Sequence, residues 1–183
     1  MPDLTIIKDS ADIATPIIFG LATLYFAWKA FVYDREQIQA AREADICSWS
    51  EKCLKALCSA EGLCELSDQM LDEMGWLNRK SEVLGELSAL VDYGRLYFPN
   101  VVDGRFGLHK EVAYQGVRQP ILDHLVDAHR IVLRSRFRSG EGHQQRKSIV
   151  EQRRAFISRV YEQINPHRRL GFLKREAVLK DSN

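Results

Sequence analysis

The longest apolar run in the chain lies near the N-terminus. The 21 residues from Ile13 to Tyr33 contain a single charged side chain, Lys29. At about 1.5 Å of rise per residue, a helix of this length matches the roughly 30 Å hydrocarbon core of a bilayer. Pro16 would fall in the first turn, where its missing N–H costs little. The pattern predicts a membrane-spanning helix over residues 13–33.

Several side chains of this run are expected to contact lipid. Trp28 suits the headgroup level, and Lys29 can extend its ammonium toward water. Two alternatives are a buried helix of a soluble domain, which usually shows a polar stripe, and a cleaved signal peptide, which needs a basic N-terminal region. The preceding residues are instead mainly acidic. The predicted anchor residues are Ile13, Ile17, Ile18, Leu21, Leu24, Trp28 and Lys29.

The charges beside the run predict its orientation. Three acidic residues and one lysine precede it, whereas Lys29, Arg35 and Arg42 lie at its C-terminal side. The positive-inside rule therefore places residues 1–12 outside as a short extracytoplasmic tail. We expect a single-pass protein of the cell membrane, with a cytoplasmic helical bundle at residues 34–166 and a basic C-terminal tail at residues 167–183.

After the span, the apolar pattern changes to helical periodicity. Residues 34–71 contain no proline and one glycine, Gly62, so the helix is expected to continue beyond the membrane. A heptad frame fits from Ile46, and a second apolar stripe covers another face, which is typical of a helix packed between neighbours in a bundle. Those neighbours could belong to this chain or to another copy. The predicted partner-binding residues are Trp49, Leu63 and Met70.

The remaining pattern predicts an antiparallel bundle of about four helices. The second helix is expected from an N-cap at Ser81 to about Leu96, after a turn at Gly75. The third begins at Pro120, and the fourth opens at a capping box, Ser148 to Glu151, and ends before Pro166. The fold class is therefore all-α, with the N-terminal span continuing into the first helix of the bundle.

Residues 99–119 are the least regular part of the chain. Asp103-Gly104 is a turn signal, which predicts a small hairpin between residues 101–102 and 105–106. A long loop that contains aromatic, histidine and charged residues is often functional. Here the same segment could equally serve as a cover over one end of the bundle.

The net charge of +1 conceals a strong asymmetry. Residues 34–100 contain 13 acidic and 7 basic residues, whereas residues 101–183 contain 9 and 17. The halves could pack on each other, or the basic half could bind anionic lipid; nucleic acid ranks third. The candidate residues for an anionic surface are Arg130, Arg134, Arg138, Arg153 and Arg154.

The four cysteines predict packing rather than chemistry. Cys47, Cys53, Cys58 and Cys64 are separated by 6, 5 and 6 positions, and zinc sites use closer pairs. In a cytoplasmic setting we expect reduced thiols that pack as small apolar groups. The sequence indicates no metal site and no cofactor.

Arg118 and His124 provide the one catalytic candidate. Their spacing resembles the R-x4-6-H motif of HEPN ribonucleases, which are small helical-bundle proteins. The resemblance implies that Arg118 would bind an RNA phosphate and that His124 would move a proton. The alternative is that both are surface residues of the bundle.

The main prediction for function is a membrane-anchored helical interaction module without catalysis of its own. It would bind lipid through the span and either a protein partner or further copies of itself through helix faces. The alternatives are a membrane-tethered HEPN-like ribonuclease or toxin-type effector using Arg118 and His124, and a single-span effector that permeabilises the membrane.

Overall fold

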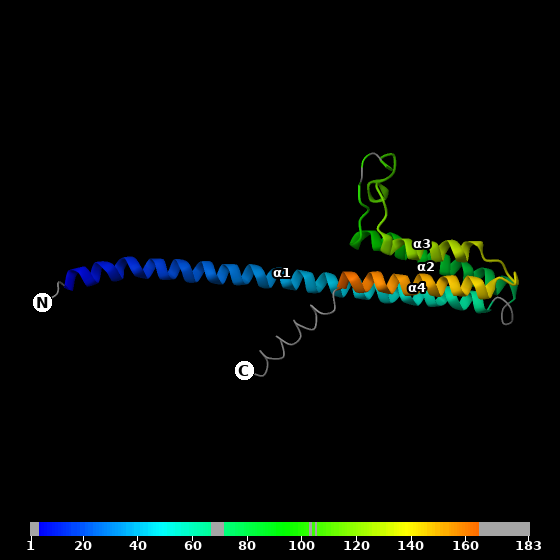
Figure 1. Cartoon of the computed structure of the whole chain (residues 1–183), viewed down its shortest axis with the longest axis horizontal. Coiled ribbons are helices and arrows are strands. Elements are labelled where there is room, and N and C mark those ends of the chain that lie inside the picture. The colour runs from blue at the N-terminus through cyan, green and yellow to red at the C-terminus, as the bar shows by residue number, and fades with distance from the viewer. Residues whose placement is uncertain (1–3, 67–71, 103, 105, 165–183) are drawn as a thin grey trace, which may run out of the picture. The chain divides into compact units, whose positions relative to one another are not determined.

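The computed structural model describes residues 4–66, 72–102, 104 and 106–164, and for residues 4–18 and 66 the description is limited to the backbone. Across these residues it contains four α-helices and a short 3-10 helix but no β-strand, so the predicted all-α fold is confirmed (Figure 1). The chain divides into two units, residues 1–44 and 45–183. Each unit is described by itself.

Helix α1 (Leu4–Leu66) provides the first unit and continues into the second. It begins nine residues before the predicted span, so Pro16 lies inside the helix and not in its first turn. The predicted continuation of the helix beyond residue 33 is confirmed. The reason is local: residues 34–61 contain neither proline nor glycine to end it.

The first unit exposes its large apolar side chains. Phe19, Leu24 and Phe26 are 70, 72 and 67% exposed, and the predicted anchor residues Leu21 and Trp28 are exposed as well. The anchor positions 13, 17 and 18 lie outside the residues whose side chains are described. Within the described residues, no helix combines the length and apolar character needed to cross a bilayer, so the predicted span is not confirmed.

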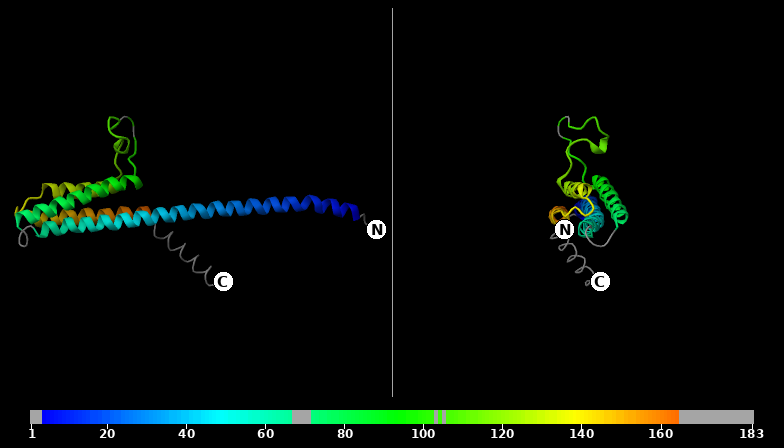
Figure 2. Two further views of the ribbon diagram at one scale, coloured as in Figure 1. Left: turned by 180° about the vertical axis from the view of Figure 1, so that it is seen from behind. Right: turned by 90° about the vertical axis from the view of Figure 1, so that its right-hand side faces the viewer.

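The second unit is a helical bundle. Its helices are residues 45–66 of α1, α2 (Glu73–Tyr97), α3 (Pro120–Arg134) and α4 (Gly142–Ile164), and Figure 2 shows them side by side. Helix α4 runs antiparallel to α1, because Arg153 contacts Glu61 whereas Phe156 packs on Trp49. Lys80 Nζ, from the first half of α2, donates to the carbonyls of Leu133 and Ser135 at the end of α3 (2.9 and 2.8 Å), which makes these two helices antiparallel as well.

The heptad positions of α1 form the core, as their periodicity indicates. The described members of the frame between residues 46 and 63 are buried, and Trp49 and Leu63 are each 1% exposed. Their neighbours come from the chain's own helices. The prediction that Trp49 and Leu63 bind a partner is therefore corrected, because the bundle itself covers both side chains; Met70 lies outside the described residues.

Trp49 lies at the centre of an aromatic cluster. Its ring centroid lies 5.5 Å from that of Phe98 and 5.6 Å from that of Phe156, and its Nε1–H donates to the carbonyl of Leu90 at 3.0 Å. Gly94 of α2 packs directly against the same indole. One side chain of α1 thus joins the end of α2 to α4.

Two helix starts differ from the prediction. Helix α2 begins at Glu73, because Asp72 is its N-cap and accepts from the backbone N–H of Gly75 at 2.8 Å. Gly75 is thus part of the first turn, and Ser81 lies inside the helix. Helix α4 begins at Gly142, so Ser148 lies in its interior; the start of α3 at Pro120 is confirmed.

Candidate functional site

A pocket of about 670 Å³ lies where the end of α2, the 99–119 loop and the start of α3 meet. Its volume falls within the usual range for small-molecule sites. Cationic, aromatic and carboxylate side chains line it together. The residues that line the pocket include Arg95, Asn100, Phe106, Tyr114, Arg118 and Asp123.

The loop is closed at its base by a pair of backbone hydrogen bonds. Val101 and Val117 exchange N–H···O=C bonds of 2.8 Å in both directions, and the N–H of Gly116 donates to the carbonyl of Phe106 at 3.1 Å. Gly116 has φ +78°, and a Cβ there would lie 2.3 Å from the carbonyl oxygen of Val101. Val101 thus pairs across the whole loop, whereas the predicted hairpin includes residues 103 and 105, which lie outside the described residues.

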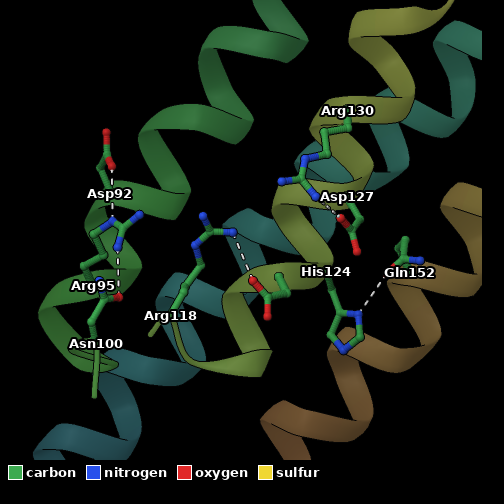
Figure 3. Close-up of polar contacts among 9 residues, drawn as sticks. Asp92, Arg95, Asn100, Arg118, His124, Asp127, Arg130 and Gln152 are labelled. Atoms are coloured by element: carbon green, nitrogen blue, oxygen red, sulfur yellow. Dashed lines mark hydrogen bonds and ion pairs between the residues drawn. The ribbon is translucent and has the colours of Figure 1, made fainter. Parts of the chain in front are cut away.

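Arg95 forms one wall of the pocket. Its side chain is 10% exposed, and its Nη1 donates to Oδ1 of Asn100 at 3.0 Å (Figure 3). Its guanidinium lies 4.5 Å from the ring centroid of Tyr114, and the hydroxyl of Tyr114 donates to Asp92. That hydrogen bond to a carboxylate raises the pKa of Tyr114. The sequence did not single out Arg95, and only the irregular loop pointed to this region.

Arg118 enters the same pocket from the residues just before α3. Its Nη1 donates to Oδ1 of Asp123 at 3.0 Å, and the side chain is 29% exposed. Nε of Arg118 is buried without a hydrogen-bond partner among the described residues, and Nε of Arg95 lies 3.5 Å from Oδ1 of Asp92. Two guanidinium groups, each with five N–H donors, therefore line one cavity.

His124 belongs to a different environment. Its Nδ1 lies 2.9 Å from Oε1 of Gln152 on α4, and it is not among the residues that line the pocket. In Figure 3, His124 points toward Gln152 whereas Arg118 extends on the other side of α3. The structure does not bring the predicted catalytic pair together.

The five arginines predicted to form an anionic surface are distributed over α3, α4 and the segment between them. Arg130 is paired with Asp127 at 3.0 Å, and Arg153 with Glu61 at 3.3 Å. Arg138 lies over the ring of Phe137, and Arg134 and Arg154 are exposed. Two of the five thus have carboxylate partners among the described residues.

No disulfide joins the cysteines in the described part of the chain. Cys53 and Cys64 are buried, and burial raises the pKa of Cys64 to about 11 and that of Cys53 further still. Both thiols are therefore protonated at neutral pH and pack as small apolar groups. Within the described residues, no three His, Cys, Asp or Glu side chains form a group that could hold a metal ion.

Comparisons of the chain with protein families, with curated proteins and with solved structures find no match.

Proposed function

We propose that this protein is a helical interaction module held at the cell membrane by its N-terminal helix, without catalysis of its own. The observation that supports the proposal is the set of apolar side chains that α1 exposes between residues 19 and 38. The anchor would comprise residues 13–33, with the bundle and the C-terminal tail in the cytoplasm.

The exposed side chains point in every direction around the helix. At 100° per residue, Phe19, Tyr25 and Phe31 lie about 120° apart around the helix axis, and Leu21 and Leu24 add to the same surface. A helix that is apolar all round requires an apolar environment all round. A bilayer provides one, and continuous apolar surface of this extent marks a contact site in proteins generally.

The bundle would supply the partner contacts. Its core residues Trp49 and Leu63 are occupied within the chain, so the binding face must be built from other side chains. Exposed apolar residues suited to a protein contact are Leu96, Val112 and Phe106 (74, 83 and 60% exposed). The partner would be a second protein or another copy, and exposed Arg134 and Arg154 could add contact with anionic lipid.

The geometry gives no support to RNA cleavage by Arg118 and His124. General acid–base catalysis on a phosphodiester needs both groups within reach of one phosphate. Here Arg118 is paired with Asp123 and His124 contacts Gln152 on α4. We therefore do not propose the ribonuclease activity.

Charged substitutions in the apolar stretch test the anchor. In the double variant Leu21→Arg/Leu24→Arg, we expect most of the protein to move from the carbonate-washed membrane pellet to the supernatant, because arginine is costly at the centre of a span. Leu108→Arg/Leu133→Arg is the matched control: it makes the same double change at leucines of the second unit that are 51 and 55% exposed, and it should stay with the membrane. Wild-type protein in the supernatant would contradict the proposal.

The exposed thiol of Cys58 can report the orientation. In a Cys47→Ala background, Cys58 is the thiol expected to react with a maleimide, because Cys53 and Cys64 are buried. A membrane-impermeant maleimide should label it only after the cells are permeabilised, because the proposed topology places the bundle in the cytoplasm. A Cys58→Ala variant gives the background signal. Equal labelling of intact cells would place the bundle outside and reverse the proposed topology.

A further inference from the structure

We propose that the pocket beside α3 binds a small organic anion. Arg95 and Arg118 would hold its single carboxylate or phosphate group, and the rings of Phe106 and Tyr114 would cover its apolar body. This site is independent of the membrane anchor and of any catalytic role.

The two arginines provide the reason to expect an anion. The side chain of Arg95 is nine-tenths buried and lines the pocket; its Nε lies 3.5 Å from Asp92 and its Nη1 donates to Asn100. Arg118, 29% exposed, lines the same pocket and donates from its Nη1 to Asp123. A guanidinium has five N–H donors, more than these contacts use, so the two groups can bind one oxyanion together.

The carboxylates near the pocket limit the charge of the ligand. Asp123 already accepts from Arg118, Asp92 lies 3.5 Å from Nε of Arg95, and Glu111 also lines the cavity. With Lys110 included, the lining holds three cations and two carboxylates. One anionic group fits this balance, whereas a polyphosphate or a nucleic-acid strand would bring several charges close to the carboxylates.

The aromatic rings indicate an apolar body. Phe106 and Tyr114 line the pocket and are 60 and 41% exposed. Lys110 lies 5.7 Å from the ring centroid of Phe106, and Arg95 lies 4.5 Å from that of Tyr114. Each of the two rings thus lies beside a cation, and small-molecule sites in general combine apolar walls with a few polar groups.

The experiment is a calorimetric titration of the full-length protein in mild detergent with four probes. Phenyl phosphate and benzoate carry a ring and one anionic group, whereas inorganic phosphate and acetate lack the ring. We expect saturable binding of at least one ring-bearing probe, about tenfold or more tighter than its ring-free counterpart. Comparison of phenyl phosphate with benzoate distinguishes a phosphate ligand from a carboxylate ligand.

Arg118→Gln should weaken binding of the better probe by about tenfold or more, because it removes a charged donor. Arg159→Gln on α4, whose side chain is exposed and paired with Glu162, is the control and should leave the affinity within about twofold. Phe106→Ser, at an exposed position, tests the ring contact independently if Arg118→Gln perturbs folding.

Three results would overturn the proposal. They are the absence of saturable binding by both ring-bearing probes, equal affinity for the ring-free anions, and equal losses in the Arg118 and Arg159 variants. Circular dichroism of each variant shows whether a loss of binding reflects a loss of fold, in which case Phe106→Ser decides.

Discussion

Replacing Trp49 with alanine is expected to destabilise the bundle by roughly 3–5 kcal/mol. The indole is 1% exposed and touches aromatic rings from the end of α2 and from α4, so its removal leaves a large cavity at the point where three helices meet. The Nε1–H bond to Leu90, which adds about 1 kcal/mol, is lost as well. Urea unfolding followed by circular dichroism measures the change in the free energy of unfolding.

The neighbouring residue provides the control. Ser48 is exposed on the same turn of α1, and Ser48→Ala should change the free energy of unfolding by less than about 0.5 kcal/mol. Trp49→Phe should fall between the two, because it keeps a ring but loses the donor. A loss below about 1 kcal/mol for Trp49→Ala would mean that the indole is not at the centre of the core.

The second large effect is expected at Gly94. A Cβ at this position would lie 2.6 Å from both Cδ2 of Leu122 and Cζ2 of Trp49, which are held in the core. Gly94→Ala should therefore destabilise the bundle by roughly 1–3 kcal/mol through overpacking. Thermal unfolding of the variant measures the effect.

Gly85 on the same helix is a control with the opposite sign. No atom lies within 4 Å of a Cβ built there, so Gly85→Ala should stabilise the protein by about 0.5–1 kcal/mol through helix propensity alone. An increase in the free energy of unfolding for both Gly94→Ala and Gly85→Ala would contradict the close packing of Gly94 against Trp49.

Helical periodicity predicted the core of α1 well. Apolar side chains at regular spacing must face other apolar groups, and Ile46, Trp49, Ala56 and Leu63 do so. The periodicity did not identify the neighbour, because one stripe packs equally well on the same chain or on another copy. For this reason the sequence predicted a partner contact for Trp49, whereas in the structure its ring packs on Phe98 and Phe156 of the same chain.

The helix ends and the loop were harder to predict because they depend on local competition and distant pairing. Gly75 suggested the end of a helix, whereas the cap at Asp72 places it in a first turn. Val101 pairs with Val117 and not with its near neighbours, and a local turn signal carries no information about a partner sixteen positions away.

The pocket depends on tertiary structure in the same way. Arg95 and Arg118 line the same pocket because the end of α2 lies near the start of α3. Neither the spacing nor the charge of these residues in the sequence predicts that proximity. Arg118 precedes the first residue of α3, so its spacing to His124 does not place the two side chains on one helical face.

The ion pairs between α1 and α4 affect how strongly the arginines of α4 can bind an outside polyanion. Glu61, whose side chain is 15% exposed, contacts both Arg146 and Arg153, and Glu65 contacts Arg146. A lipid headgroup or a nucleic-acid phosphate that approached these arginines would have to compete with carboxylates fixed on the same bundle. Glu61 and Glu65 thus compete with any outside anion for Arg146 and Arg153, and they do so at a very high effective concentration because they belong to the same chain. This competition would lower the affinity of these arginines for weakly bound, non-specific anions.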